Sequence, residues 1–189
     1  MIVKRKYPLL SACGLNCGLC PYFHTIGNSK CDGCGGENFN EKHCSCSIIN
    51  CNQRKGIEFC YFCEEYPCKK YGKWEKDSFI THQNMMKNFE KVKNTGLNIY
   101  KKELNEKIKL LNYLLTNYND GRRKSFFCLA VNLLELDDVK NAIKKLKKDT
   151  VSGNLDIKEK AIIAVKLFEA TAKEKNIILK LNKQPHLAG

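Results

Sequence analysis

Beyond residue 80, apolar and polar positions alternate with a helical period. A first amphipathic segment has Thr81 as its candidate N-cap and closes at Gly96. A second, longer segment advances in steps of three and four residues and ends at the turn sequence 119–121. Their apolar positions are Met85, Met86, Phe89 and Val92, then Tyr100, Leu104, Ile108, Leu111, Leu115 and Tyr118. The pattern predicts one short helix followed by one long helix.

Three further amphipathic segments follow. Ser125 is the candidate cap of the first and Asp137 begins the second, while Asp156 and Glu159 open the third as a capping box would. Residues 150–154 predict a hinge before the last helix, and residues 184–189 are expected to fray. Their apolar positions are Phe126, Leu129, Ala130, Leu133 and Leu134, then Val139, Ile143 and Leu146, then Ala161, Ala164, Val165, Phe168 and Ala172. The sequence therefore predicts a mainly α protein whose tail is a small helical bundle.

The head of the chain is defined by cysteines instead of by a hydrophobic period. Eleven of the twelve cysteines lie between Cys13 and Cys68, and the remaining one is Cys128. We therefore predict an irregular, cysteine-rich, zinc-binding region over residues 1–80 and a basic helical region over residues 81–189. The alternative is that the two regions pack as one unit.

Clustered cysteines form disulfides in exported proteins and metal sites in the reducing cytoplasm. Lys4, Arg5 and Lys6 could begin a signal peptide, and residues 10–13 look like a lipoprotein cleavage box, but only three residues separate them. The longest apolar run, residues 126–131, is too short for a membrane span of about 20 residues. We therefore expect a cytoplasmic protein with reduced thiols and no membrane partner.

The cysteine spacing favours metal binding. Two residues between cysteines allow both thiolates to reach one ion, and nearby glycines permit the tight turns. Four pairs, Cys17/Cys20, Cys31/Cys34, Cys46/Cys51 and Cys60/Cys63, could supply two four-thiolate zinc sites. Cys13 and Cys68 are left over from these four pairs. They could replace a member of a pair, bridge two ions, or join His43, His24 or Cys44 in a third site. We expect two or three zinc ions; the spacing leaves the grouping open, and His43, His24 and His82 are more simply loop histidines.

Three motifs together resemble a known family. They are Cys-Gly-Leu-x-Cys-x-x-Cys at 13–20, Cys-x-Gly-Cys at 31–34, and Cys-x-x-Cys-Glu-Glu-Tyr-Pro-Cys at 60–68. The chain thereby resembles the uncharacterised cysteine-rich prokaryotic family called domain of unknown function 3795, over roughly residues 10–95 and less closely over 121–128. The resemblance implies zinc binding and no established activity. The ligands that it implies are Cys13, Cys17, Cys20, Cys31, Cys34, Cys46, Cys51, Cys60, Cys63 and Cys68; Cys44 and Cys128 depart from the pattern.

Closed cysteine sites favour a non-enzymatic zinc module that presents a surface to a protein or nucleic-acid partner. The first alternative is an iron–sulfur enzyme of the radical S-adenosylmethionine type using the Cys13, Cys17 and Cys20 triplet, although such enzymes have an α/β barrel. The second is a metal-handling or redox protein with a reactive thiol at Cys44 or Cys68. Since no catalytic motif is present, we assign no catalytic residue.

The net charge of +13 belongs mainly to the tail, where residues 69–189 hold 26 Lys and Arg against 14 Asp and Glu. The densest basic cluster is Arg122, Arg123 and Lys124, which could grip nucleic-acid phosphate. The cluster is explained more simply as solvent-exposed residues at the start of the third predicted helix, because no base-reading motif accompanies it.

Overall fold

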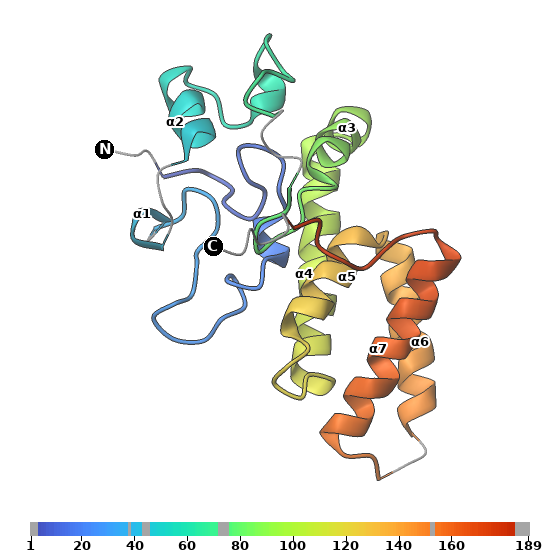
Figure 1. Cartoon of the computed structure of the whole chain (residues 1–189). Coiled ribbons are helices and arrows are strands. Elements are labelled where there is room, and N and C mark those ends of the chain that lie inside the picture. Colours follow the sequence, from blue (N-terminus) through green and yellow to red (C-terminus); the bar gives the residue numbers. More distant parts are fainter. Residues whose placement is uncertain (1–3, 38, 43–45, 72–75, 152–153, 184–189) are drawn as a thin grey trace, which may run out of the picture. The chain divides into compact units, whose positions relative to one another are not determined.

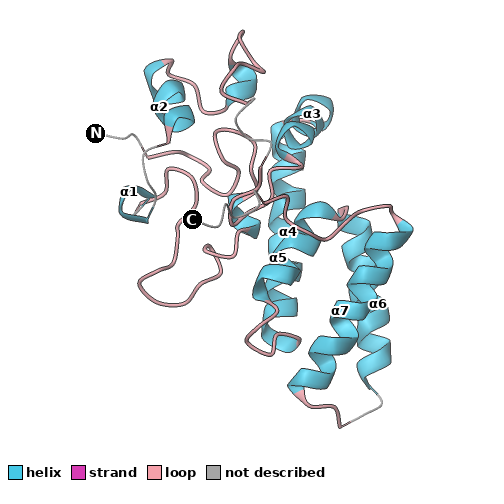
Figure 2. Cartoon of the chain, viewed as in Figure 1, coloured by secondary structure: helices cyan, strands magenta, loops and turns pink. Residues whose placement is uncertain are grey.

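The structure is a computed structural model that describes residues 4–37, 39–42, 46–71, 76–151 and 154–183 (Figure 1). Within these ranges the chain forms helices and loops and no strand (Figure 2). The predicted mainly α class is therefore confirmed, as is the order of a cysteine-rich head followed by helices. The chain divides into two compact units, which are residues 1–101 with 181–189 and residues 102–180.

The first unit consists mostly of loops. Its short elements are the 3-10 turns η1 (Cys17–Leu19) and η2 (Cys60–Phe62) and the helices α1 (Phe39–Lys42), α2 (Ser47–Arg54) and α3 (Met85–Thr95), followed by the start of α4 (Leu97–Asn117). Its core is apolar and almost fully shielded, with Leu10, Leu19, Ile48, Phe59 and Phe89 at most 1% exposed.

The second unit is a helical bundle formed by the rest of α4 with α5 (Lys124–Leu133), α6 (Leu136–Val151) and α7 (Ile157–Glu174). Helix α7 packs against α5 and α6 (Figure 1). The largest fully buried side chains are Leu104, Leu111, Leu114, Phe127, Leu134 and Phe168. Within the described ranges, no helix is both long and apolar enough to cross a bilayer.

Of the three predicted N-caps, Asp156 is confirmed, whereas Thr81 and Ser125 are wrong. Asp156 forms the predicted capping box with Glu159 at the start of α7. Helix α3 begins after Asn84 and not at Thr81, because the Asp77 carboxylate accepts the backbone N–H of His82 at 2.6 Å and holds this segment as a loop.

Helix α5 begins at Lys124, one residue before the predicted cap Ser125. Asn119 and Asp120 hold the preceding turn by accepting the backbone N–H groups of Arg123 and Arg122 at 3.0 and 2.9 Å. The predicted hinge at 150–154 lies partly outside the described residues, since α6 continues to Val151 and 152–153 are not described. The expected fraying of 184–189 lies wholly outside them.

Candidate metal centre

The ten cysteines that the family resemblance singles out lie around two cavities in the first unit. The larger cavity, about 310 Å³, is lined by six of them, and we call it the six-cysteine cavity. The smaller, about 40 Å³, is lined by the other four, and we call it the four-cysteine cavity. The six are Cys13, Cys17, Cys20, Cys31, Cys34 and Cys46, and the four are Cys51, Cys60, Cys63 and Cys68. Each cavity therefore offers at least the four thiols that one tetrahedral ion needs.

This grouping differs from the pairs that the spacing suggested. Cys46 and Cys51 are close in sequence but line different cavities. Cys46 is the residue before α2, whereas Cys51 lies inside the helix. The helix thus connects the two cysteine groups, and Cys13 and Cys68, for which the spacing gave no place, each join one group.

Two C-x-x-C motifs fold alike. In η1 the backbone N–H of Cys20 donates to the carbonyl of Cys17 at 3.1 Å, and in η2 that of Cys63 donates to the carbonyl of Cys60 at 2.9 Å. A single 3-10 turn brings residues i and i+3 onto the same side of the chain. Both thiols of each motif therefore line the same cavity.

Backbone and hydroxyl groups contact the thiols of the six-cysteine cavity. The N–H groups of Ala12 and Gly33 donate to the Sγ atoms of Cys34 and Cys31 at 3.5 and 3.4 Å. The Ser11 hydroxyl lies 3.0 Å from Cys13 Sγ. Metal-bound thiolate sulfur is commonly supported by donors of this kind.

The four-cysteine cavity has a charged donor and an amide. Lys55 Nζ lies 3.2 Å from Cys63 Sγ, and the Cys60 thiol donates to Asn52 Oδ1 at 3.2 Å. Asn52 is only 4% exposed, and its Nδ2 is one of the few buried side-chain polar atoms without a hydrogen-bond partner in the described part of the chain. An amide rotated by 180° exchanges its oxygen and nitrogen, so Nδ2 could donate to a Cys60 thiolate. The site therefore fits an ionised, metal-bound Cys60 as well as the neutral thiol.

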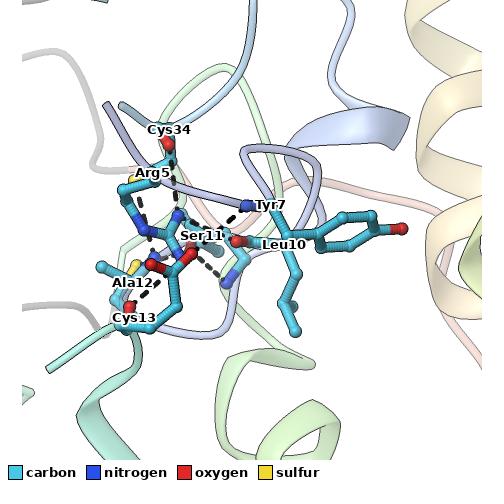
Figure 3. Close-up of polar contacts among 9 residues, drawn as sticks. Arg5, Tyr7, Leu10, Ser11, Ala12, Cys13 and Cys34 are labelled. Carbon is cyan, nitrogen blue, oxygen red and sulfur yellow. Dashed lines mark hydrogen bonds and ion pairs between the residues drawn. The ribbon is translucent and has the colours of Figure 1, made fainter. Parts of the chain in front are cut away.

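A buried arginine lies next to Cys34, one of the residues that line the six-cysteine cavity (Figure 3). The Arg5 guanidinium donates to the carbonyl oxygens of Leu10, Cys34 and Glu58 at 2.9, 3.1 and 3.1 Å. It also forms an ion pair with the Glu58 carboxylate at 3.3 Å and lies over the Phe59 ring. Its Nε atom is buried and has no hydrogen-bond partner among the described residues. A fixed cation and a spare donor are thus held next to the Cys34 thiol.

Burial determines the protonation of these thiols. It raises the pKa of Cys13 to about 12, with the nearby Cys34 thiol as the second cause, and raises that of Cys17 well above its ordinary value. It also raises the pKa of Cys34, although the Arg5 guanidinium acts in the opposite direction. A divalent cation would therefore have to displace protons from these groups, which makes metal binding depend on pH.

No disulfide joins two of the eleven cysteines that the structure describes. Across the same described ranges, no three His, Cys, Asp or Glu side chains are already arranged as an ion-binding group. An ion would therefore have to draw the sulfur atoms inward around each cavity. The ligand role of the ten cysteines stays a prediction.

The other singled-out residues are placed as follows. Cys44 and His43 lie outside the described residues, and Cys128 is buried within α5 in the second unit. His82 lines the six-cysteine cavity, which spacing alone did not indicate because it is 36 residues beyond Cys46. Tyr71, also not singled out, lines the four-cysteine cavity and donates its hydroxyl to the carbonyl of Cys13 at 3.2 Å.

The basic cluster Arg122, Arg123 and Lys124 lies at the start of α5, as predicted for the third helix. Arg123 is already engaged, since its Nε lies 3.7 Å from the Asp120 carboxylate. Among the aromatic side chains between the cysteines, Phe59 is buried and stacks on Tyr61, with ring centroids 5.6 Å apart. Phe59 thus fills the core, and nucleic-acid binding by the cluster stays a prediction.

These features define a cysteine-rich protein with two groups of thiols in an otherwise helical chain. Residues 9–73 match the model of the family described as "Protein of unknown function (DUF3795)". The resemblance is thus confirmed over residues 9–73, a range that includes the ten cysteines it singles out, and the match ends before α3. Comparison with curated proteins gave no match, and comparison with solved structures gave none either.

Proposed function

We propose that the first unit binds metal ions, in the simplest case zinc, at the six-cysteine and four-cysteine cavities, and that the ions are structural. The observation that carries the proposal is the distribution of the ten cysteines: six line one cavity and four line another, although together they span 56 residues. Residues scattered for ordinary packing would not be expected to gather in this way.

The donor set supports the same proposal. Sulfur ligands suit zinc and other soft or borderline ions. The Asn52 amide and the Arg5 guanidinium each place a buried N–H donor without a partner beside one group, among the residues that the structure describes. Such donors would stabilise thiolate sulfur once an ion replaces the protons.

A structural role fits a unit that consists mostly of loops and short helices. Binding of a structural zinc contributes on the order of 10 kcal/mol to folding. We therefore propose a non-enzymatic module whose metal-stabilised loops present a surface to a protein or nucleic-acid partner. An iron–sulfur cofactor is the alternative, and metal analysis decides between them.

The test is elemental analysis of protein purified anaerobically without chelator, followed by thermal unfolding with and without a chelator. We expect at least two zinc ions per chain and a lower Tm after chelation. Cys63→Ala should lose one ion, whereas the matched variant Cys128→Ala, which removes a buried cysteine from the second unit, should lose none. Protein without bound metal, with a Tm that chelation leaves unchanged, would contradict the proposal.

A further inference from the structure

The two cavities differ in size and in thiol number. The six-cysteine cavity, about 310 Å³, has nearly eight times the volume of the four-cysteine cavity, about 40 Å³. A space of about 40 Å³ corresponds to one or two water molecules. It therefore suits a single ion surrounded by four thiolates, whereas the larger cavity has room for more than one.

The number of thiols leads to the same distinction. Two tetrahedral ions have eight coordination positions between them. Six thiolates fill all eight positions when two of them bridge both ions, because each bridging sulfur counts twice. With a single ion, two buried thiols would stay unligated in the same cavity.

Two of the six thiols meet the same short loop. Cys13 Sγ lies 3.0 Å from the Ser11 hydroxyl, and Cys34 Sγ accepts the N–H of the adjacent residue Ala12 at 3.5 Å. Cys13 and Cys34 are also buried, at 5% and 7% exposed. These two thiols, which are 21 residues apart in the sequence, are therefore held side by side, as shared ligands must be.

On the basis of the proposed function, we infer that the six-cysteine cavity holds two divalent ions that share Cys13 and Cys34 as bridging thiolates. The four-cysteine cavity then holds one ion. Cys17, Cys20, Cys31 and Cys46 are then terminal ligands, two for each ion. Four positive and six negative charges leave the cluster with two excess negative charges. Arg5, whose guanidinium donates to the Cys34 carbonyl, places a buried positive charge next to this cluster.

The test loads metal-free protein anaerobically with ¹¹³Cd²⁺ and measures cadmium per chain and ¹¹³Cd NMR spectra. We expect three ions, of which two show mutual scalar coupling through shared sulfur and one shows none. Cys34→Ser should abolish the coupling and keep the third resonance. Cys63→Ser, the matched variant, should remove the uncoupled resonance and keep the coupled pair.

Two ions per chain without coupling in the unmodified protein would overturn the bridged cluster and leave the proposed function standing. Iron with inorganic sulfide in the protein as isolated would also overturn it, because sulfide and not cysteine would then bridge the ions. A chain that binds no cadmium would overturn both proposals. The spectrum of the unmodified protein decides even where Cys34→Ser does not fold.

Discussion

The guanidinium of Arg5 donates to the carbonyl oxygen of Cys34 at 3.1 Å, across 29 residues of sequence. The same group satisfies the carbonyls of Leu10 and Glu58, so one buried side chain ties the start of the chain to three loops. Its side chain is 5% exposed. The packing of the loops around the six-cysteine cavity therefore depends on Arg5.

Replacing Arg5 by Met should destabilise the protein by about 3 kcal/mol or more, because three carbonyls lose their donor and a partly buried ion pair loses one partner. Arg5→Lys should recover only part, since an ammonium group does not span the same acceptors. Urea unfolding of the chelated protein measures this. Lys4→Met is the control: the Lys4–Glu37 pair is exposed, so it should change the unfolding free energy by about 1 kcal/mol or less. Equal effects of Arg5→Met and Lys4→Met would contradict the role of Arg5.

Gly14 cannot accept a side chain without movement of the loop. Its φ is +97°, and an added Cβ would lie 2.3 Å from the carbonyl oxygen of Met85. Gly14→Ala should therefore cost about 1–3 kcal/mol for overpacking in addition to about 1–2 kcal/mol for backbone strain.

Gly27→Ala is the matched control for Gly14. Its φ is +84°, but an added Cβ would meet no atom within 4 Å, so it should show only the strain. Chemical denaturation of both variants gives the difference. A Gly27 variant as unstable as the Gly14 variant would show that the close approach to Met85 is unimportant.

The metal-free protein should lose stability in alkaline solution. Burial raises the pKa of Cys13 from 9.0 to about 12. Between these values the unfolded chain has released the proton while the folded chain still holds it, so the free energy of unfolding falls as pH rises. The effect is absent below about pH 9 and grows toward pH 12. Urea unfolding with chelator and reductant between pH 8 and 11 measures it, and a stability that increases across this range would contradict the prediction.

The start of α7 provides a prediction independent of metal. Asp156 accepts the N–H of Glu159 at 2.8 Å, and the Glu159 carboxylate accepts the N–H of Asp156 at 2.9 Å. Asp156→Ala should reduce the unfolding free energy by about 0.5–2 kcal/mol. Lys158→Ala, on the exposed side of the same turn, should have little effect. Thermal unfolding of the two variants compares them, and indistinguishable Tm values would count against the cap.

Several helices were predictable because their signals are local. The capping residues of α7 and the apolar stripe of α4 follow from neighbours within one or two turns of helix. The buried face of α4 nevertheless differs from the predicted apolar stripe at two positions. Leu114 is fully buried where Leu115 was expected. Lys107 is also buried, and its Nζ donates to the Leu134 carbonyl at 2.6 Å. Leu134 directly follows the C-terminus of α5, so this contact joins residues that are 27 positions apart in the sequence.

By itself, the sequence determined the helical class, the cysteine-rich head and the match of residues 9–73 to a family model, because periodicity and C-x-x-C spacing are properties of short stretches of chain. Only the tertiary structure decided which thiols share a cavity. Cys46 and Cys51 separate because α2 begins between them, and Cys31 and Cys34 join Cys13 because the N–H of Cys34 donates to the carbonyl of Pro8 at 2.9 Å. Grouping of this kind depends on how loops meet in space, which no local spacing encodes.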